Sequence, residues 1–90
     1  MNLDEAMGKA LKEMRMATGL PQEAIGASQS FVSDVERGKK SVTIGRLEAF
    51  AQSVQVQPAT LLIKASLIQN PELSIDELFA RIRTELTTGV

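Results

Sequence analysis

The stretch that decides the fold, residues 28–40, reads Ser-Gln-Ser-Phe-Val-Ser-Asp-Val-Glu-Arg-Gly-Lys-Lys. Ser28 favours a helix start as an N-cap, and Gly38 favours a helix end because glycine readily adopts the left-handed conformation. At about 100° per residue, the polar and apolar side chains of this helix separate onto two faces. One face carries Gln29, Ser30, Ser33 and Arg37, and the other carries Phe31, Val32 and Val35.

The polar face differs from an ordinary surface helix, where the strong helix formers Lys and Glu are favoured. Short hydrogen-bonding side chains let a helix approach a DNA major groove closely. Gln can bind adenine through two hydrogen bonds, Ser is versatile, and Arg suits guanine or phosphate. This face is therefore a candidate for reading bases. An ordinary solvated face is the alternative interpretation.

The net charge of the whole chain does not favour binding to nucleic acid. The net charge is −1 and the isoelectric point is about 5.4, whereas nucleic-acid-binding domains are usually basic. Fields act over roughly one Debye length, ~8 Å at physiological salt, so local clusters matter more than the total. Four cations and no acidic residue lie between positions 37 and 46: Arg37, Lys39, Lys40 and Arg46. A solvated turn is the alternative interpretation of this cluster.

Apolar residues at helical spacing extend to both sides of this stretch. On the N-terminal side we expect a helix from about Leu3 that ends at Gly19, and then a short helix over residues 22–25 opened by Pro21. On the C-terminal side, Thr43 is the expected N-cap of a further helix.

Two more helices are expected beyond it. Pro58 suits the first position of a helix that continues to about Gln69, and residues 74–77, Ser-Ile-Asp-Glu, form a capping box for the last one. No segment alternates with period two. The expected fold is all-α, a compact domain of five to six short helices, with residues 1–69 as its main body and residues 70–90 as a C-terminal helix.

The residues that the chain lacks exclude several classes of function. Without Cys or His, metal sites built on these ligands, Cys nucleophiles and the Ser-His-Asp arrangement are impossible. We therefore expect no catalytic residues, no metal site and no cofactor, and the chain is not expected to be an enzyme. No signal peptide or membrane-spanning run is recognisable, so a cytoplasmic protein without a membrane partner is expected.

Three motifs resemble the phage repressor/Cro-type helix-turn-helix family, the xenobiotic-response-element-like bacterial transcriptional regulators. They are Gly-Leu-Pro-Gln-Glu at 19–23, Ser-Gln-Ser-Phe-Val-Ser at 28–33 and Glu-Arg-Gly-Lys-Lys at 36–40. They occur in the family's order, and the similarity covers roughly residues 7–63. The resemblance implies a lambda-repressor-like fold and double-stranded DNA as the partner.

The resemblance also implies roles for individual residues. Those expected to face base edges are Gln29, Ser30 and Ser33, with Arg37 contacting a base or a phosphate. Those expected at the phosphate backbone are Gln22, Ser28, Lys39, Lys40 and Thr43, where Gln22 could instead brace the recognition helix. Arg15 and Glu36 match a structural ion pair of the family, although two unrelated surface charges are the alternative.

Two departures of the chain from the family pattern bear on the expected contacts. Between Gln22 and Ser28 the chain is about four residues shorter, close to one helical turn, so we expect a shortened second helix or a tightened turn. Asp34 stands where the family often has Arg or Lys. A carboxylate there repels phosphate unless it accepts a hydrogen bond from cytosine, and a solvent-facing or intramolecularly paired residue is the alternative.

The C-terminal helix has more apolar surface than a small domain needs. Its tentative dimer interface consists of Leu78, Phe79, Ile82 and Leu86. The alternative is that this helix folds back and completes the core.

Together with the family resemblance, the sequence predicts a DNA-binding transcriptional repressor that binds a palindromic operator as a homodimer. The competing hypothesis is an antitoxin-like module that binds another protein through its C-terminal helices.

Overall fold

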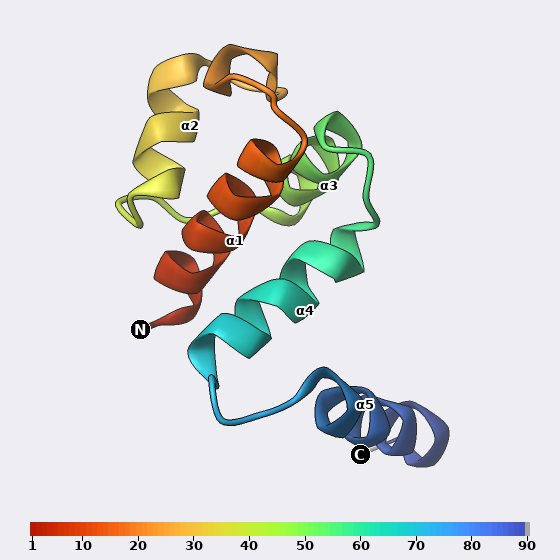
Figure 1. Cartoon of the computed structure of the whole chain (residues 1–90). Helices are drawn as coiled ribbons and strands as arrows, with labels where there is room; N and C mark the ends of the chain where they lie inside the picture. Colours follow the sequence, from red (N-terminus) through yellow and green to blue (C-terminus); the bar gives the residue numbers. More distant parts are fainter. Residues whose placement is uncertain (90) are drawn as a thin grey trace.

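The computed structural model describes residues 1–89 and contains only helices over that range. They are α1 (Leu3–Ala17), the 3-10 turn η1 (Gln22–Ala24), α2 (Gln29–Glu36), α3 (Ile44–Ser53), α4 (Pro58–Gln69) and α5 (Ile75–Thr88). Helices α1 to α4 pack into one body, and α5 lies apart from it at the other end of an elongated molecule of 40 × 23 × 23 Å (Figure 1). The predicted all-α fold is confirmed.

Local hydrogen bonds define the helix starts as predicted. The Ser28 hydroxyl accepts from the Phe31 backbone N–H, the Thr43 hydroxyl accepts from Arg46, and Ser74 and Glu77 form a reciprocal capping box. Asn2 and Glu5 form a second capping box at α1, which the sequence reading overlooked. The expected helix ends are also present, because Gly19 and Gly38 follow α1 and α2 with φ of 73° and 75°.

The expected short second helix is reduced to the single 3-10 turn η1, in line with the missing residues before Ser28. The backbone becomes extended at Ile25, directly after η1, and the Ile25 side chain is buried in the core. The Gly26 backbone N–H then donates to the Ser53 hydroxyl of α3 over 3.0 Å. The shortened turn is therefore anchored to the body of the molecule on both sides of its bend.

The core is formed by α1 to α4 and by Ile25, the residue that follows η1. Its fully buried large side chains are Phe50, Leu11, Ile25, Leu61, Val32, Val35 and Val54. Within α5 the sole buried apolar residue among those described is Leu78, and it lies outside this cluster. The core of residues 1–69 is therefore formed without the C-terminal helix.

An ion pair joins α1 to α2. Arg15 donates from Nε to Glu36 Oε2 over 2.6 Å and from Nη2 to Oε1 over 2.9 Å, and its Nη1 donates to the Leu20 carbonyl over 2.9 Å. The side chains of Arg15 and Glu36 are only 13% and 3% exposed. The pair that the family resemblance implies is thus present, and the guanidinium also fixes the chain just after α1.

Burial and hydrogen bonding act in opposite directions on Glu36. Burial by itself raises the pKa of a carboxyl group, but hydrogen bonds from Arg15 and Gln22 outweigh this, so the pKa of Glu36 is lowered from 4.5. The pKa of Arg15 is raised, chiefly by its hydrogen bond to Glu36. Both groups are therefore charged at neutral pH.

Replacement of Glu36 by Ala should lower the free energy of unfolding by about 3–5 kcal/mol at pH 7, because it leaves the shielded Arg15 without a partner. The difference in free energy of unfolding between the wild type and Glu36→Ala should narrow as the pH falls below 4.5 and then below the lowered pKa of folded Glu36. In that range the unfolded wild-type chain binds a proton at Glu36 more readily than the folded chain does. Urea melts at neutral and acidic pH measure both effects. Glu48→Ala, on the exposed face of α3, is the control and should change stability little.

Gly8 allows α1 and α2 to approach each other closely. A Cβ atom at this buried position would overlap the main-chain carbonyl of Val35. Gly45 in α3 offers a contrast, because no atom lies within 4 Å of the Cβ that a substitution would add there.

Gly8→Ala should therefore destabilise the protein by about 1–3 kcal/mol through overpacking. Gly45→Ala, the same change on an open helix surface, should stabilise it by about 0.5–1 kcal/mol because alanine is the better helix former. Thermal melts of the two variants compare them directly. Equal stability of the two variants would contradict the close contact between the helices.

Candidate nucleic-acid interface

The two faces of α2 lie as the sequence predicts. Val32 and Val35 are fully buried, and Phe31 is half-buried with its ring 6.3 Å from that of the core residue Phe50. On the opposite side, Gln29, Ser30 and Arg37 are exposed and Ser33 is half-buried. Helix α2 lies at the outer edge of the molecule, with η1 beside its first turn (Figure 1).

A chain of hydrogen bonds leads from the ion pair to the polar face. Gln22 in η1 donates through Nε2 to Glu36 Oε1 over 3.0 Å, and Gln29 donates through Nε2 to Gln22 Oε1 over 2.7 Å. Gln22 therefore links the base of α2 to its first residue. One N–H and the carbonyl oxygen of the Gln29 amide are left for a ligand.

Two members of the basic cluster lie over the Phe31 ring. The Arg46 guanidinium carbon lies 4.2 Å from the centre of the Phe31 ring, and Lys40 Nζ lies 5.5 Å from it. Both cations are within the range of cation–π attraction. Phe31 thus supports, from the core side, the positive charges that border the polar face of α2.

Asp34 forms intramolecular ion pairs. Its Oδ1 lies 3.0 Å from Arg37 Nη2 and its Oδ2 lies 3.6 Å from Lys40 Nζ. This arrangement corresponds to the second of the two interpretations that the sequence allows for Asp34. Within the described residues, Lys39 is the member of the cationic cluster that takes part in no ion pair or cation–π contact.

The remaining predicted contact residues are accessible. Ser28 and Thr43 are exposed at the starts of α2 and α3, where the first backbone N–H groups of a helix favour an anion. Lys39 and Lys40 are exposed in the loop between these helices. The structure therefore brings one polar face, two helix N-termini and a basic loop together around α2.

The four residues expected at a dimer interface share one stripe of α5 but differ in exposure. Phe79 and Leu86 are 45% and 79% exposed and Ile82 is half-buried, but Leu78 is only 8% exposed. All four lie within about 100° around the helix axis, with Leu78 at the edge nearest its own chain. The interface at these residues stays a prediction. Ile75, which is 55% exposed, lies on the same stripe.

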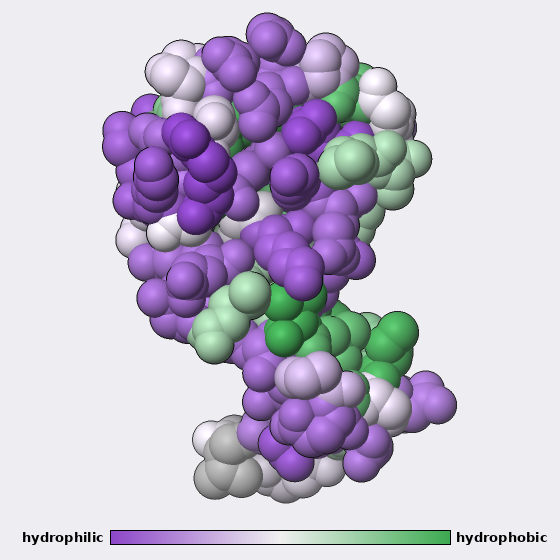
Figure 2. Space-filling view, turned by 60° about the vertical axis from the view of Figure 1, so that its left-hand side comes forward, coloured by the Kyte–Doolittle hydropathy of each residue, from purple (hydrophilic) through white to green (hydrophobic). Residues whose placement is uncertain are grey.

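Apolar side chains also gather where α5 meets the rest of the molecule, visible as a hydrophobic band above α5 in Figure 2. Met14, Ile63, Leu67, Ile75 and Phe79 contribute to a groove of about 280 Å³ between α1, α4 and α5. This groove is continuous with the outward residues of α5, since Ile75 and Phe79 belong to both.

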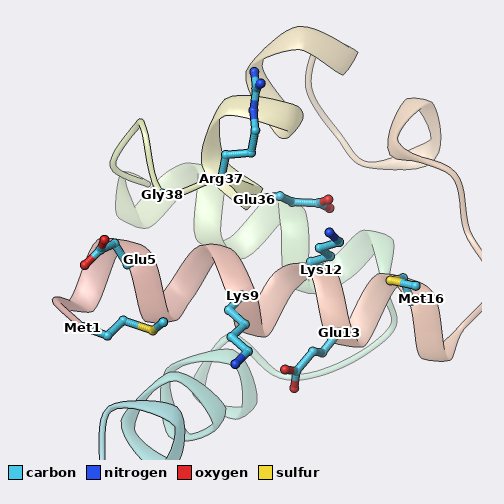
Figure 3. A pocket seen from close by; sticks show the side chains of 9 residues that line it. All are labelled: Met1, Glu5, Lys9, Lys12, Glu13, Met16, Glu36, Arg37 and Gly38. Carbon is cyan, nitrogen blue, oxygen red and sulfur yellow. The ribbon is translucent and has the colours of Figure 1, made fainter.

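A further hollow runs along the outer side of α1 below the end of α2 (Figure 3). It has a volume of about 440 Å³ and carries acidic and basic side chains side by side, among them Glu5, Lys9, Lys12 and Glu13. In Figure 3 the Glu36 carboxylate points along α1 whereas Arg37 points away from the hollow. Such mixed charges favour neither an anion nor a metal ion.

No three His, Cys, Asp or Glu side chains of residues 1–89 are grouped as they would be around a metal ion. No helix in the same range has the length and apolar character needed to cross a membrane.

Sequence reasoning did not assign roles to Phe31, Arg46 and Ile75. Phe31 was placed on the apolar face and Arg46 only in the basic cluster, because nothing local indicates that residues of α2 and α3 would stack. Ile75 fits the apolar spacing of α5, and its four-residue distance from Phe79 was the available signal.

Comparison with known proteins agrees with the geometry. The family model described as "Helix-turn-helix domain" matches residues 6–62. The search of curated proteins found no match. Among solved structures, the clp gene regulator ClgR from Corynebacterium glutamicum is 31% identical, with a TM-score of 0.67 over 73% of this chain and 90% of that one.

Two further structures are similar. A second structure of ClgR is 28% identical with a TM-score of 0.73, and it covers 97% of this chain and 95% of that one. The restriction-modification controller protein C.AhdI from Aeromonas hydrophila is 33% identical with a TM-score of 0.61, over 63% of this chain and 92% of that one. With its motifs, its fold and the family match over most of its helices, the chain belongs to the helix-turn-helix family of the phage repressor and Cro type.

Proposed function

We propose that this protein is a sequence-specific DNA-binding transcriptional repressor that binds a palindromic operator as a homodimer. The observation that carries the proposal is the exposed polar face of α2 beside the basic cluster. The similar proteins ClgR and C.AhdI are described as a gene regulator and a controller protein, which supports a regulatory role. Repression requires only that the bound protein exclude other proteins from the same DNA.

In the proposed complex, α2 enters the major groove. Gln29, Ser30 and Ser33 contact base edges, and Arg37 contacts a base or phosphate. The Gln29 amide uses one N–H for its bond to Gln22 and keeps the other N–H and its oxygen free. The free N–H can donate to adenine N7, and the oxygen can accept from the adenine N6 amino group. Gln22 acts here as a brace for Gln29, since its amide is engaged on both sides.

Phosphates on the two sides of the groove have separate partners in this proposal. Ser28 lies at the start of α2, and Lys39, Lys40 and Thr43 lie in the loop and at the start of α3. These contacts hold the protein in register but carry no sequence information.

Replacement of Gln29 by Ala should weaken binding to the preferred duplex by about 1–3 kcal/mol and relax the preference at one base position. Lys39→Ala should instead weaken binding to all sequences alike. It should also make the slope of log K against log salt shallower by the amount that corresponds to about one phosphate contact. The preferred site is first selected from a random oligonucleotide pool. Dissociation constants on selected and random duplexes are then measured at several salt concentrations.

The site assignment is wrong if Gln29→Ala changes neither affinity nor base preference. The selected site also tests the palindrome, since two-fold dimers bind half-sites about 34–36 Å apart. Repression is tested on a promoter that overlaps the selected site, where the purified protein should lower transcription and Gln29→Ala should do so less.

Helix α5 supports the homodimer. Its outward apolar residues Ile75, Phe79, Ile82 and Leu86 are spaced four, three and four residues apart, the spacing at which two helices pair along a seam. Because the core of residues 1–69 closes without α5, this helix and its groove are available to a second copy. We therefore propose residues 70–90 as a dimerisation element.

Leu86→Glu should convert the dimer to a monomer with unchanged helicity, because the charge would be buried in the seam but is harmless at a position exposed in the monomer. Sedimentation at several concentrations and circular dichroism measure the two properties. Met16→Glu places the same charge at an exposed apolar position of α1, 62% exposed, and should leave the association state unchanged. A dimer that survives Leu86→Glu and Phe79→Glu would contradict this interface.

The same exposed face of α5 favours a second candidate, an antitoxin-like module that binds another protein through its C-terminal helices. The two hypotheses differ in the role of α2. A chain that binds no duplex DNA at low salt, together with a folded α5, would favour the second one.

A further inference from the structure

We propose that Asp34 determines how tightly this protein binds DNA irrespective of sequence. Its carboxylate forms ion pairs with Arg37 and Lys40 and cancels part of the positive charge that they present to DNA phosphates. This inference rests on the proposed function, since it concerns the same surface of α2.

The geometry gives each carboxylate oxygen its own cation. Oδ1 lies 3.0 Å from Arg37 Nη2, and Oδ2 lies 3.6 Å from Lys40 Nζ. Asp34 is half-buried at the edge of the polar face, while both cations are exposed. The three side chains together carry one net positive charge, whereas Arg37 and Lys40 without Asp34 would carry two.

Lys40 is held from a second side. Its Nζ lies 5.5 Å from the centre of the Phe31 ring, and that ring is packed against Phe50 in the core. Arg46 stacks on the same ring at 4.2 Å. The cations are thus placed beside α2 even without DNA, and Asp34 is the acidic group bonded to two of them.

Exposed ion pairs of this kind are weak and exchange partners readily. Asp34 therefore does not prevent Arg37 and Lys40 from meeting phosphates. It remains close to them in the complex and cancels part of their charge, so fewer counterions are released from the DNA. The contacts of Gln29, Ser30 and Ser33 with bases do not depend on this carboxylate, so base contacts supply a larger share of the total affinity.

The test is Asp34→Asn, which removes the charge and keeps the shape of the side chain. On a random-sequence duplex at 50 mM salt, its affinity should rise about three- to tenfold over the wild type. The slope of log K against log salt should steepen by about 0.9, equivalent to one additional phosphate contact. The gain should shrink at 300 mM salt, where exposed charges are screened. Fluorescence anisotropy at four salt concentrations provides both quantities.

Glu72→Gln is the matched control, because it makes the same change of net charge in the exposed segment between α4 and α5. It should change neither the affinity nor the slope appreciably. A second comparison places Asp34→Asn in a chain that carries both Arg37→Gln and Lys40→Gln. There the gain should fall to less than twofold, because the two cations through which Asp34 acts are absent.

Three results would overturn the inference. The first is a wild-type chain that binds DNA while Asp34→Asn binds with the same affinity and slope, which leaves the proposed function intact. The second is an equal gain from Asp34→Asn with and without the two cations, which would assign the effect to net charge alone. The third is a wild-type chain that fails to bind any duplex at 50 mM salt, which contradicts the proposed function as well. Asp34→Ser provides a second neutral variant, and circular dichroism verifies that each variant is folded.

Discussion

The bidentate ion pair between Arg15 and Glu36 is the interaction on which the rest of the structure depends. It joins the end of α1 to the end of α2 in a place where both side chains are almost fully shielded from solvent. A buried carboxylate is tolerable only with partners of this quality, and Glu36 has a third hydrogen bond from Gln22. The same carboxylate therefore holds α1, α2 and the turn that precedes α2 together.

This arrangement couples the stability of the fold to the proposed reading of bases by α2. Helix α2 has only eight residues and would not persist by itself in water. It is held by Val32 and Val35 in the core, by the close approach of Gly8 to the Val35 carbonyl, and by the ion pair at its end. Because Gln29 is bonded through Gln22 to that pair, the side chain proposed to read a base is oriented by contacts that begin in the core.

The charges show why total composition is a poor guide to this surface. The chain is slightly acidic, yet the loop after α2 is basic. Within that loop and its neighbours, Asp34 and Phe31 hold Arg37, Lys40 and Arg46 in defined positions. The field that DNA would meet is therefore set by a few contacts between α2, the loop and α3, and the net charge of the protein contributes little to it.

The sequence by itself determined the local features: the all-α fold, the helix starts at Ser28, Thr43 and Ser74, and the separation of α2 into two faces. These features depend on hydrogen bonds and periodicity within a few residues, so they can be read from the chain directly. The Arg15–Glu36 pair is non-local and was accessible only because family motifs indicated it.

The tertiary structure alone decided the contacts made beyond each single helix. It determined that Lys40 in the loop reaches Asp34, that Arg46 stacks on Phe31, and that Leu78 is buried while Ile75 is 55% exposed. Such contacts depend on the angle and depth at which helices pack, and these follow from the summed packing of the whole core. No short stretch of sequence contains that information, so the same residues could be named in advance but not their partners.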